Sequence, residues 1–229
     1  MSVPMYYALV ALFVAVFSLF RYAFSLGLLE RPLVVGLVWC LLTGEWISSM
    51  SIAIFFELAW LDIIPAGTFI PPHLAIATAA SLALTKAFGL VVPGEIMLAM
   101  VVSIPLSWIG ARGESALRTF NSRGFNAGLA WARQENDTPF PDGLIYRSMV
   151  VAFLATLVSA FVALLVLHFL TGLLLPRLSS LLLGLQVTWA HLWLGASLGG
   201  ILSLRIPRAY ALFAAGVALV IFISVSTQL

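Results

Sequence analysis

The sequence predicts an all-α integral membrane protein with about six to seven membrane helices and a broken or re-entrant helical segment around residues 45–73. Hydrophobic residues make up 62% of the 229 residues and charged residues only 9%, whereas about a quarter of a soluble domain is charged. The mean hydropathy of +1.12 agrees with this class. A cluster of carboxylates and prolines between positions 45 and 73 predicts the break.

Seven apolar segments define the expected elements in chain order. They are residues 5–20, 32–42, 74–92, 96–109, 148–175, 178–204 and 209–225. Most approach the roughly 20 residues that a helix needs to cross a bilayer, and a few are shorter. The first has no preceding positive residue and no small-residue cleavage pattern, so we interpret it as a retained helix rather than a signal peptide. We treat residues 1–229 as a single membrane domain whose apolar segments are joined by short connections, one of them at 176–177.

One long polar segment, residues 111–147, interrupts this pattern. It holds five of the eleven basic residues, namely Arg112, Arg118, Arg123, Arg133 and Arg147. Loops rich in arginine and lysine stay on the cytoplasmic side of a membrane. We therefore predict a cytoplasmic loop over 111–147, with a short helix at 127–133.

The run from 45 to 73 contains the carboxylates Glu45, Glu57 and Asp62. A carboxylate near the middle of a spanning helix costs about 2.5 to 3.5 kcal/mol on insertion scales, and each proline removes a backbone donor. Such groups usually face a partner or a water-lined cavity. This run is therefore the predicted location of the functional site.

Helix geometry predicts how the run is divided. On a continuous helix Glu57 lies about 120° from Glu45, and Asp62 about 140° from Glu57, so one helix cannot direct all three carboxylates at one site. Gly44 allows a turn before Glu45, and the prolines from 65 to 72 prevent a regular helix there. We expect a helix that ends near Asp62, an extended loop, and a new helix from about His73 with free backbone donors at its start.

Each candidate side chain has a functional and a structural interpretation. Glu57 either binds a ligand or pairs with an arginine or with backbone donors inside the bundle. Glu45 and Asp62 either support the site or lie at the membrane interface. His73 is a ligand, a proton carrier or a helix-start residue. Trp60 either stacks under the apolar face of a sugar, beside a carboxylate that accepts its hydroxyl donors, or anchors the helix at the interface.

Several function classes are excluded by what the sequence lacks. It has no catalytic motif such as G-x-S-x-G or H-E-x-x-H, no phosphate-binding glycine loop and no cluster of basic residues for nucleic acid. The single cysteine, Cys40, forbids an intramolecular disulfide and a cysteine metal cluster. We expect no catalytic residue, metal or cofactor in this chain. Gly195 and Gly199 have the small-xxx-small spacing of close helix contacts, which is common in apolar helices.

A set of short motifs over about residues 30 to 85 resembles a known family. The motifs are Arg31-Pro32-Leu33, Gly44-Glu45, Glu57-Leu58 before an aromatic-rich turn, Gly67, and the proline pair that precedes position 73. Together they resemble the membrane subunit IIC of the mannose/fructose/sorbose family of the bacterial sugar phosphotransferase system.

The resemblance implies a multi-pass permease subunit in the bacterial cytoplasmic membrane, surrounded by lipid and paired with a IID-like membrane subunit. The sugar would bind in the membrane and be carried across by movement of a transport domain. A phosphohistidine on the soluble protein IIB would then phosphorylate it, with IIA as the second soluble phosphocarrier. A homo-oligomeric complex is left open. The implied sugar-binding residues are Glu57, Trp60, Gly67, Thr68, Pro72 and His73, with support from Glu45 and Asp62.

One departure from the family leaves the substrate open. Family members commonly have aspartate after the proline, whereas this chain has His73, which offers one donor and one acceptor in place of two acceptor oxygens. An alternative class is a proton- or sodium-coupled transporter of a small polar solute that uses Glu57 and Asp62. A third is a structural subunit that has lost transport.

Overall fold

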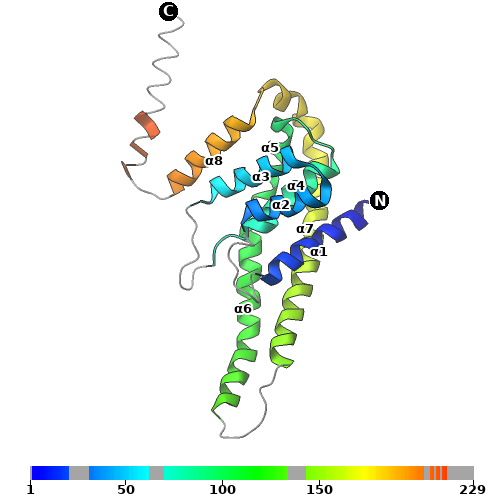
Figure 1. Ribbon diagram of the computed structural model, residues 1–229, viewed down its shortest axis with the longest axis vertical. Helices are drawn as coiled ribbons and strands as arrows, with labels where there is room; N and C mark the ends of the chain where they lie inside the picture. Colours follow the sequence, from blue (N-terminus) through cyan, green and yellow to red (C-terminus); the bar gives the residue numbers. More distant parts are fainter. Residues whose placement is uncertain are drawn as a thin grey trace, which may run out of the picture.

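A computed structural model describes residues 2–20, 31–61, 70–133 and 143–203, together with 207–208, 210–211 and 213–215. Every regular element within these residues is helical, which confirms the all-α class (Figure 1). The helices are α1 (Val3–Leu19), α2 (Pro32–Thr43), α3 (Trp46–Ala59), α4 (Leu74–Ala87), α5 (Pro93–Ser103), α6 (Pro105–Ala132), α7 (Gly143–Gly184) and α8 (Trp189–Ser203).

The helices fall into two length classes. Residues Pro93–Ala132, which comprise α5 and α6 with only Ile104 between them, and Gly143–Gly184, which form α7, are long and apolar enough to cross a membrane. By contrast α2, α3 and α4 have 12, 14 and 14 residues. At 1.5 Å per residue they extend about 18 to 21 Å, which is shorter than the roughly 30 Å hydrocarbon core. Two of these short helices, α3 and α4, lie before and after the prolines of the predicted break in the chain.

Glycine and proline set the ends of the short helices. Pro32 begins α2, and Gly44 ends it with φ of 77°, a left-handed conformation that glycine adopts without strain. The chain then reverses into α3 at Glu45, as the sequence predicts. Gly36 lets α2 and α3 approach closely, because a Cβ at position 36 would lie only 2.4 Å from the Cβ of Ala53.

The helix after the predicted break begins where expected. His73 is the residue that precedes the first turn of α4, and residues 71–72 before it are not helical. Gly89, with φ of 61°, and Pro93 form the turn into α5. The buried middle of α4 consists largely of alanine, serine and threonine, and this helix packs against α1, α2, α3, α5, α6 and α7. Small residues permit such close approach on several sides.

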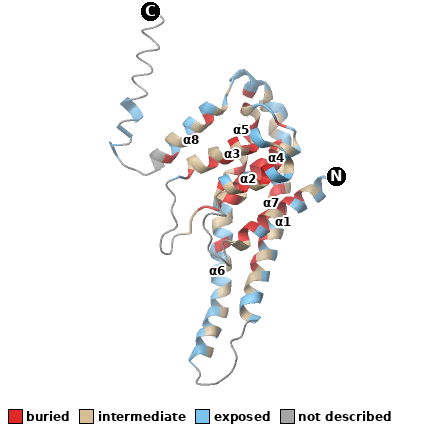
Figure 2. Ribbon diagram, viewed as in Figure 1, coloured by how far each residue is buried: buried red, intermediate tan, exposed pale blue. Residues whose placement is uncertain are grey.

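The polar segment 111–147 is helical over most of the residues that the structure describes, and its cytoplasmic location stays a prediction. Helix α6 continues through it to Ala132, and α7 begins at Gly143. The arginines, glutamates, alanines and leucines of this segment are good helix formers, so the helix continues through it; most of the side chains here are exposed, but that of Glu114 is buried. Figure 1 shows α6 and α7 extending together away from the other helices, and Figure 2 shows that their far ends are largely exposed.

The helix boundary predicted at residues 176–177 is wrong. Pro176 lies inside α7, and the chain turns later, where Gln186 has φ of 46° and α8 starts at Trp189. A proline removes only one backbone hydrogen bond, whereas ending a helix in lipid would leave several groups unsatisfied. Close packing of α8 on α3 depends on Gly200, where a Cβ would lie 2.7 Å from the carbonyl oxygen of Leu58.

The core lies where α1 to α5 meet the middle of α7 (Figure 2). The largest fully buried side chains include Tyr7, Phe56, Ile52, Leu82 and Met100. The hydroxyl of Tyr7 lies 2.9 Å from Nδ1 of His168, and the imidazole of His168 stacks on Phe88. His168 thus joins α1 and α7 in the core.

Candidate functional site

His73 lies at a junction of three helices. Its backbone N–H donates to the carbonyl oxygen of Ser107 at the start of α6 (2.8 Å), and its Nε2 is 3.1 Å from Oγ of Ser18 on α1. The residue is only 3% exposed. Because Pro72 favours extended backbone at Pro71, the chain reaches His73 without a preceding helical turn. A buried imidazole with these contacts is fixed in position.

The wall opposite His73 is a stripe of α6. A Cβ at Gly110 would lie 2.8 Å from the Cβ of His73, so only glycine fits there without displacement. Next to this contact is a cavity of about 490 Å³ between the start of α4, one face of α6 and one face of α7. Its polar lining consists of His73, Glu114, Thr156 and Ser159. Its size and mostly apolar lining match the usual character of small-molecule sites.

Glu114 is a polar residue of the cavity that the sequence reasoning missed. Its side chain is 0% exposed, and its Oε1 accepts a hydrogen bond from Nη2 of Arg118 at 2.5 Å, one turn further along α6. The sequence does contain a signal for this position, namely the spacing of polar and small residues along the helix. Gly110, Glu114 and Arg118 recur every four residues and share one helix face. In the sequence, Glu114 falls within the predicted polar loop 111–147.

Glu57 makes an ion pair across the α2–α3 hairpin. Nη1 of Arg31 lies 3.2 Å from Oε1 of Glu57, and the backbone N–H of Leu33 donates to Oε2 at 3.4 Å. The Glu57 side chain is 13% exposed and that of Arg31 is 37% exposed. This is the structural interpretation that the sequence left open, with a partner 26 residues away in the chain. Binding of a ligand by the same carboxylate stays a prediction.

Trp60 is 8% exposed and packs between aromatic rings. Its indole stacks on Phe56, with ring centroids 5.5 Å apart and an interplanar angle of 6°, and meets Trp108 of α6 edge-on at 6.4 Å. One face of the ring is therefore occupied by Phe56. The proposed stacking of Trp60 under a sugar stays a prediction.

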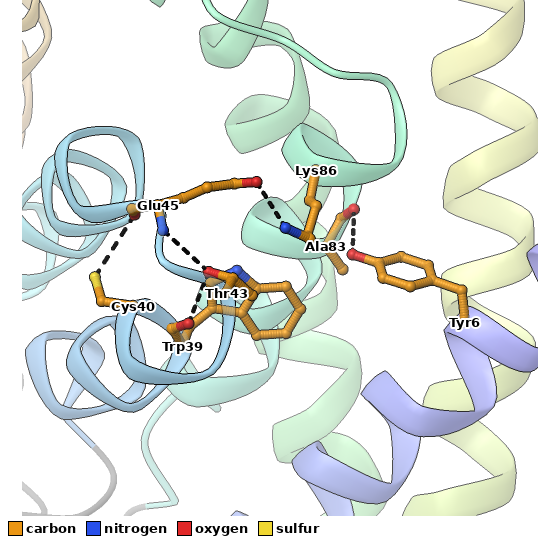
Figure 3. A network of polar contacts seen from close by, with 7 residues as sticks. All are labelled: Tyr6, Trp39, Cys40, Thr43, Glu45, Ala83 and Lys86. Atoms are coloured by element: carbon orange, nitrogen blue, oxygen red, sulfur yellow. Dashed lines mark hydrogen bonds and ion pairs between the residues drawn. The ribbon is translucent and has the colours of Figure 1, made fainter. Parts of the chain in front are cut away.

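Glu45 lies at the other end of α3. Its Oε1 is 2.7 Å from Nζ of Lys86, near the end of α4, and the backbone N–H of Glu45 donates to Oγ1 of Thr43 (Figure 3). In the same network the hydroxyl of Tyr6 donates to the carbonyl oxygen of Ala83. The contacts connect α1, the α2–α3 turn and α4. Glu45 and Glu57 thus have separate partners at opposite ends of α3.

Comparison with protein families adds an independent observation. The family model described as the phosphotransferase system (PTS) sorbose-specific IIC component matches residues 5–201, which is most of the chain. The chain belongs to this family. No curated protein matches it. As a PTS IIC component the protein is a membrane subunit of a sugar permease, and it serves sugar transport. The matched range contains every residue of the candidate site.

The predicted site residues of this IIC component divide into three groups. Trp60 and His73 lie at the same end of the short helices, since both contact the first turn of α6, through Trp108 and Ser107; buried Pro72 directly precedes His73. Glu57, three residues before Trp60, points to Arg31, and Glu45 lies at the far end. Asp62, Gly67 and Thr68 lie outside the described residues. Cys40 is buried and contacts the backbone at the start of α3.

Proposed function

We propose that this IIC component binds a sugar within the bacterial cytoplasmic membrane, at the end of α3 and the start of α4, and releases it toward the cytoplasmic face. There a partner IIB protein phosphorylates the sugar, with IIA as phosphate source and a IID-like subunit completing the permease. The observation that carries this proposal is the membership of residues 5–201 in the sorbose-specific IIC family.

The placement of Glu57 and His73 supports the location. The two residues flank the interruption between two short helices, and both are polar groups with low exposure in a chain of mean hydropathy +1.12. Interrupted helices with ionisable groups at membrane depth are characteristic of transporter binding sites. In this proposal the carboxylate accepts sugar hydroxyls and the imidazole offers one donor and one acceptor.

The charge distribution supports the orientation. Arg112 and Arg118 lie on α6, Arg133 directly follows its last residue, and Arg147 lies in the first turns of α7. The positive-inside rule places this end in the cytoplasm. Since His73 contacts α6 near its start and Lys86 lies at the opposite end of α4, the His73 end of the short helices is on the cytoplasmic side in this proposal.

The test is uptake of labelled mannose, fructose and sorbose by cells that produce the chain with IID, IIA and IIB. Glu57→Gln should lower uptake at limiting sugar at least roughly tenfold, because the acceptor of the sugar hydroxyls loses its charge. The protein should remain in the membrane. Glu95→Gln, a carboxylate exchange in the first turn of α5, is the matched control and should retain uptake.

Arg31→Gln separates ligand binding from support. If Glu57 contacts the sugar, its carboxylate remains an acceptor in Arg31→Gln, so that variant should lose less uptake than Glu57→Gln. If Glu57 acts only through the ion pair, the two single variants and the double variant should show the same loss of sugar uptake. Uptake that needs an ion gradient and yields unphosphorylated sugar would overturn the phosphotransferase role in favour of an ion-coupled transporter.

A further inference from the structure

The cavity between α4, α6 and α7 combines features that a lipid-filled groove does not require. Three of its polar residues are deeply buried: His73 is 3% exposed, Glu114 1% and Thr156 7%. Burial of a carboxylate in an apolar bundle is costly, and such residues usually mark a substrate or ion pathway. A groove that only holds acyl chains gains nothing from them.

The lining follows one face of each long helix. Leu106, Gly110, Gly113, Glu114, Leu117 and Phe120 line the cavity from α6, at the three- and four-residue spacing of one helix face. Thr156 and Ser159 line it from α7. A carboxylate, an imidazole, two hydroxyls and the ring of Phe120 therefore border a single space.

Glycine keeps this space open. A Cβ at Gly113 would meet no atom within 4 Å, whereas a Cβ at Gly110 would meet His73. Since glycine costs about 1 kcal/mol relative to alanine inside a helix, two glycines on the cavity face need a reason beyond helix formation. Gly110 makes room for His73, and the space beside Gly113 is free for a ligand.

We propose that this cavity is a sugar subsite on the cytoplasmic side of the permease and that Glu114, together with His73, recognises sugar hydroxyls there. The proposal rests on the proposed function and extends it to a carboxylate outside the 45–73 run. The carboxylate oxygens of Glu114 accept hydrogen bonds from sugar hydroxyls, the hydroxyls of Thr156 and Ser159 donate or accept hydrogen bonds, and Phe120 contacts the apolar face of the sugar ring. Arg118 positions the carboxylate through Oε1. Because the cavity lies where α6 becomes charged, a sugar bound there is close to the face at which IIB acts.

The first experiment measures KM and maximal rate for mannose, fructose and sorbose with the complete complex in proteoliposomes. Glu114→Gln should raise KM for the transported sugar by roughly 10- to 100-fold, since the acceptor loses its charge. Gly113→Leu should fill the cavity and abolish saturable uptake without loss of folded protein. Gly128→Leu is the matched control, because it lies on the same helix about 22 Å further along, and a Cβ there also meets no atom within 4 Å.

A second experiment reports occupancy directly and does not depend on transport. Cys40 is the only cysteine and is buried, so Ser159→Cys introduces a single accessible thiol. A membrane-impermeant, hydrophilic maleimide applied from the cytoplasmic side should label it, and the transported sugar should slow labelling at least fivefold. Val158→Cys is the control, because Val158 lies on the neighbouring exposed face of α7 and does not line this cavity. The transported sugar should not change its labelling rate.

The outcomes separate this inference from the proposed function. An unchanged KM in both Glu114→Gln and Gly113→Leu, with a complex that still transports sugar, would overturn the subsite and leave the permease role intact. A Ser159→Cys thiol that reacts only with lipid-soluble reagents would also overturn it, because lipid then fills the cavity. Failure of the unaltered complex to take up and phosphorylate any of the three sugars would overturn the proposed function itself.

Discussion

Replacement of Gly36 by alanine tests the tight α2–α3 hairpin that holds Glu57 against Arg31. The added Cβ would lie 2.4 Å from the Cβ of Ala53 and 3.3 Å from the carbonyl oxygen of Ser49. Carbon atoms pack best at about 3.5 to 4.0 Å, so α2 and α3 must separate by roughly 1.1 to 1.6 Å locally. Overpacking of this kind costs about 1 to 3 kcal/mol. This corresponds to a roughly 5- to 160-fold rise in the unfolding equilibrium constant.

The assay is thermal or denaturant unfolding of the purified protein in detergent. Gly36→Ala should unfold at lower temperature, and the double variant Gly36→Ala/Ala53→Gly should recover most of the loss, since it moves the methyl group from α3 to α2. Gly195→Ala is the control, because a Cβ there meets no atom within 4 Å. If Gly36→Ala is as stable as the unaltered protein, or the double variant does not recover, the close approach of α2 and α3 is wrong.

Two further substitutions test single contacts by the same unfolding measurement. Gly44→Ala should destabilise the protein by about 1 to 2 kcal/mol, because φ of 77° places a Cβ near the following carbonyl oxygen; stability equal to that of Gly195→Ala would contradict the left-handed turn. Nε1 of Trp193 donates a hydrogen bond to the carbonyl oxygen of Ser51 at 3.1 Å. Trp193→Phe removes this bond and should lower the free energy of unfolding by about 1 kcal/mol. Trp46→Phe, which changes a half-exposed indole, is the control. An equal loss of stability in that variant would show that the hydrogen bond between α8 and α3 is not the cause.

Local signals predicted the positions where helices start and stop. Gly44 before Glu45, the prolines before His73 and Pro93 each restrict the backbone through their own atoms, so they act in any tertiary context. Pro176 was misinterpreted because its effect does depend on context. In an apolar layer the helix continues past a single lost hydrogen bond. For the segment 111–147 the sequence predicts a short helix only at 127–133, whereas α6 runs through to Ala132, because arginine, glutamate, alanine and leucine all favour helix.

The candidate site was predicted only in part, and the missing part is long-range. Arg31 and Glu57 are 26 residues apart, and His73 reaches Ser18 across 55 residues, so no periodicity connects them. Glu114 was overlooked because a carboxylate beside arginines suggests a solvated surface. Its complete burial follows from the approach of α6 to α4 and α7, which the linear pattern does not contain.

The sequence by itself determined the membrane class, the break before His73 and the turn at Gly44, because hydropathy and backbone sterics are properties of single residues and their neighbours. The tertiary structure alone decided which charges pair and which polar groups share a cavity. Glu57 is directed to Arg31, Glu45 to Lys86, and Glu114 to the space beside His73. These partners depend on the rotation and contact of whole helices, and that information resides in packing and not in spacing.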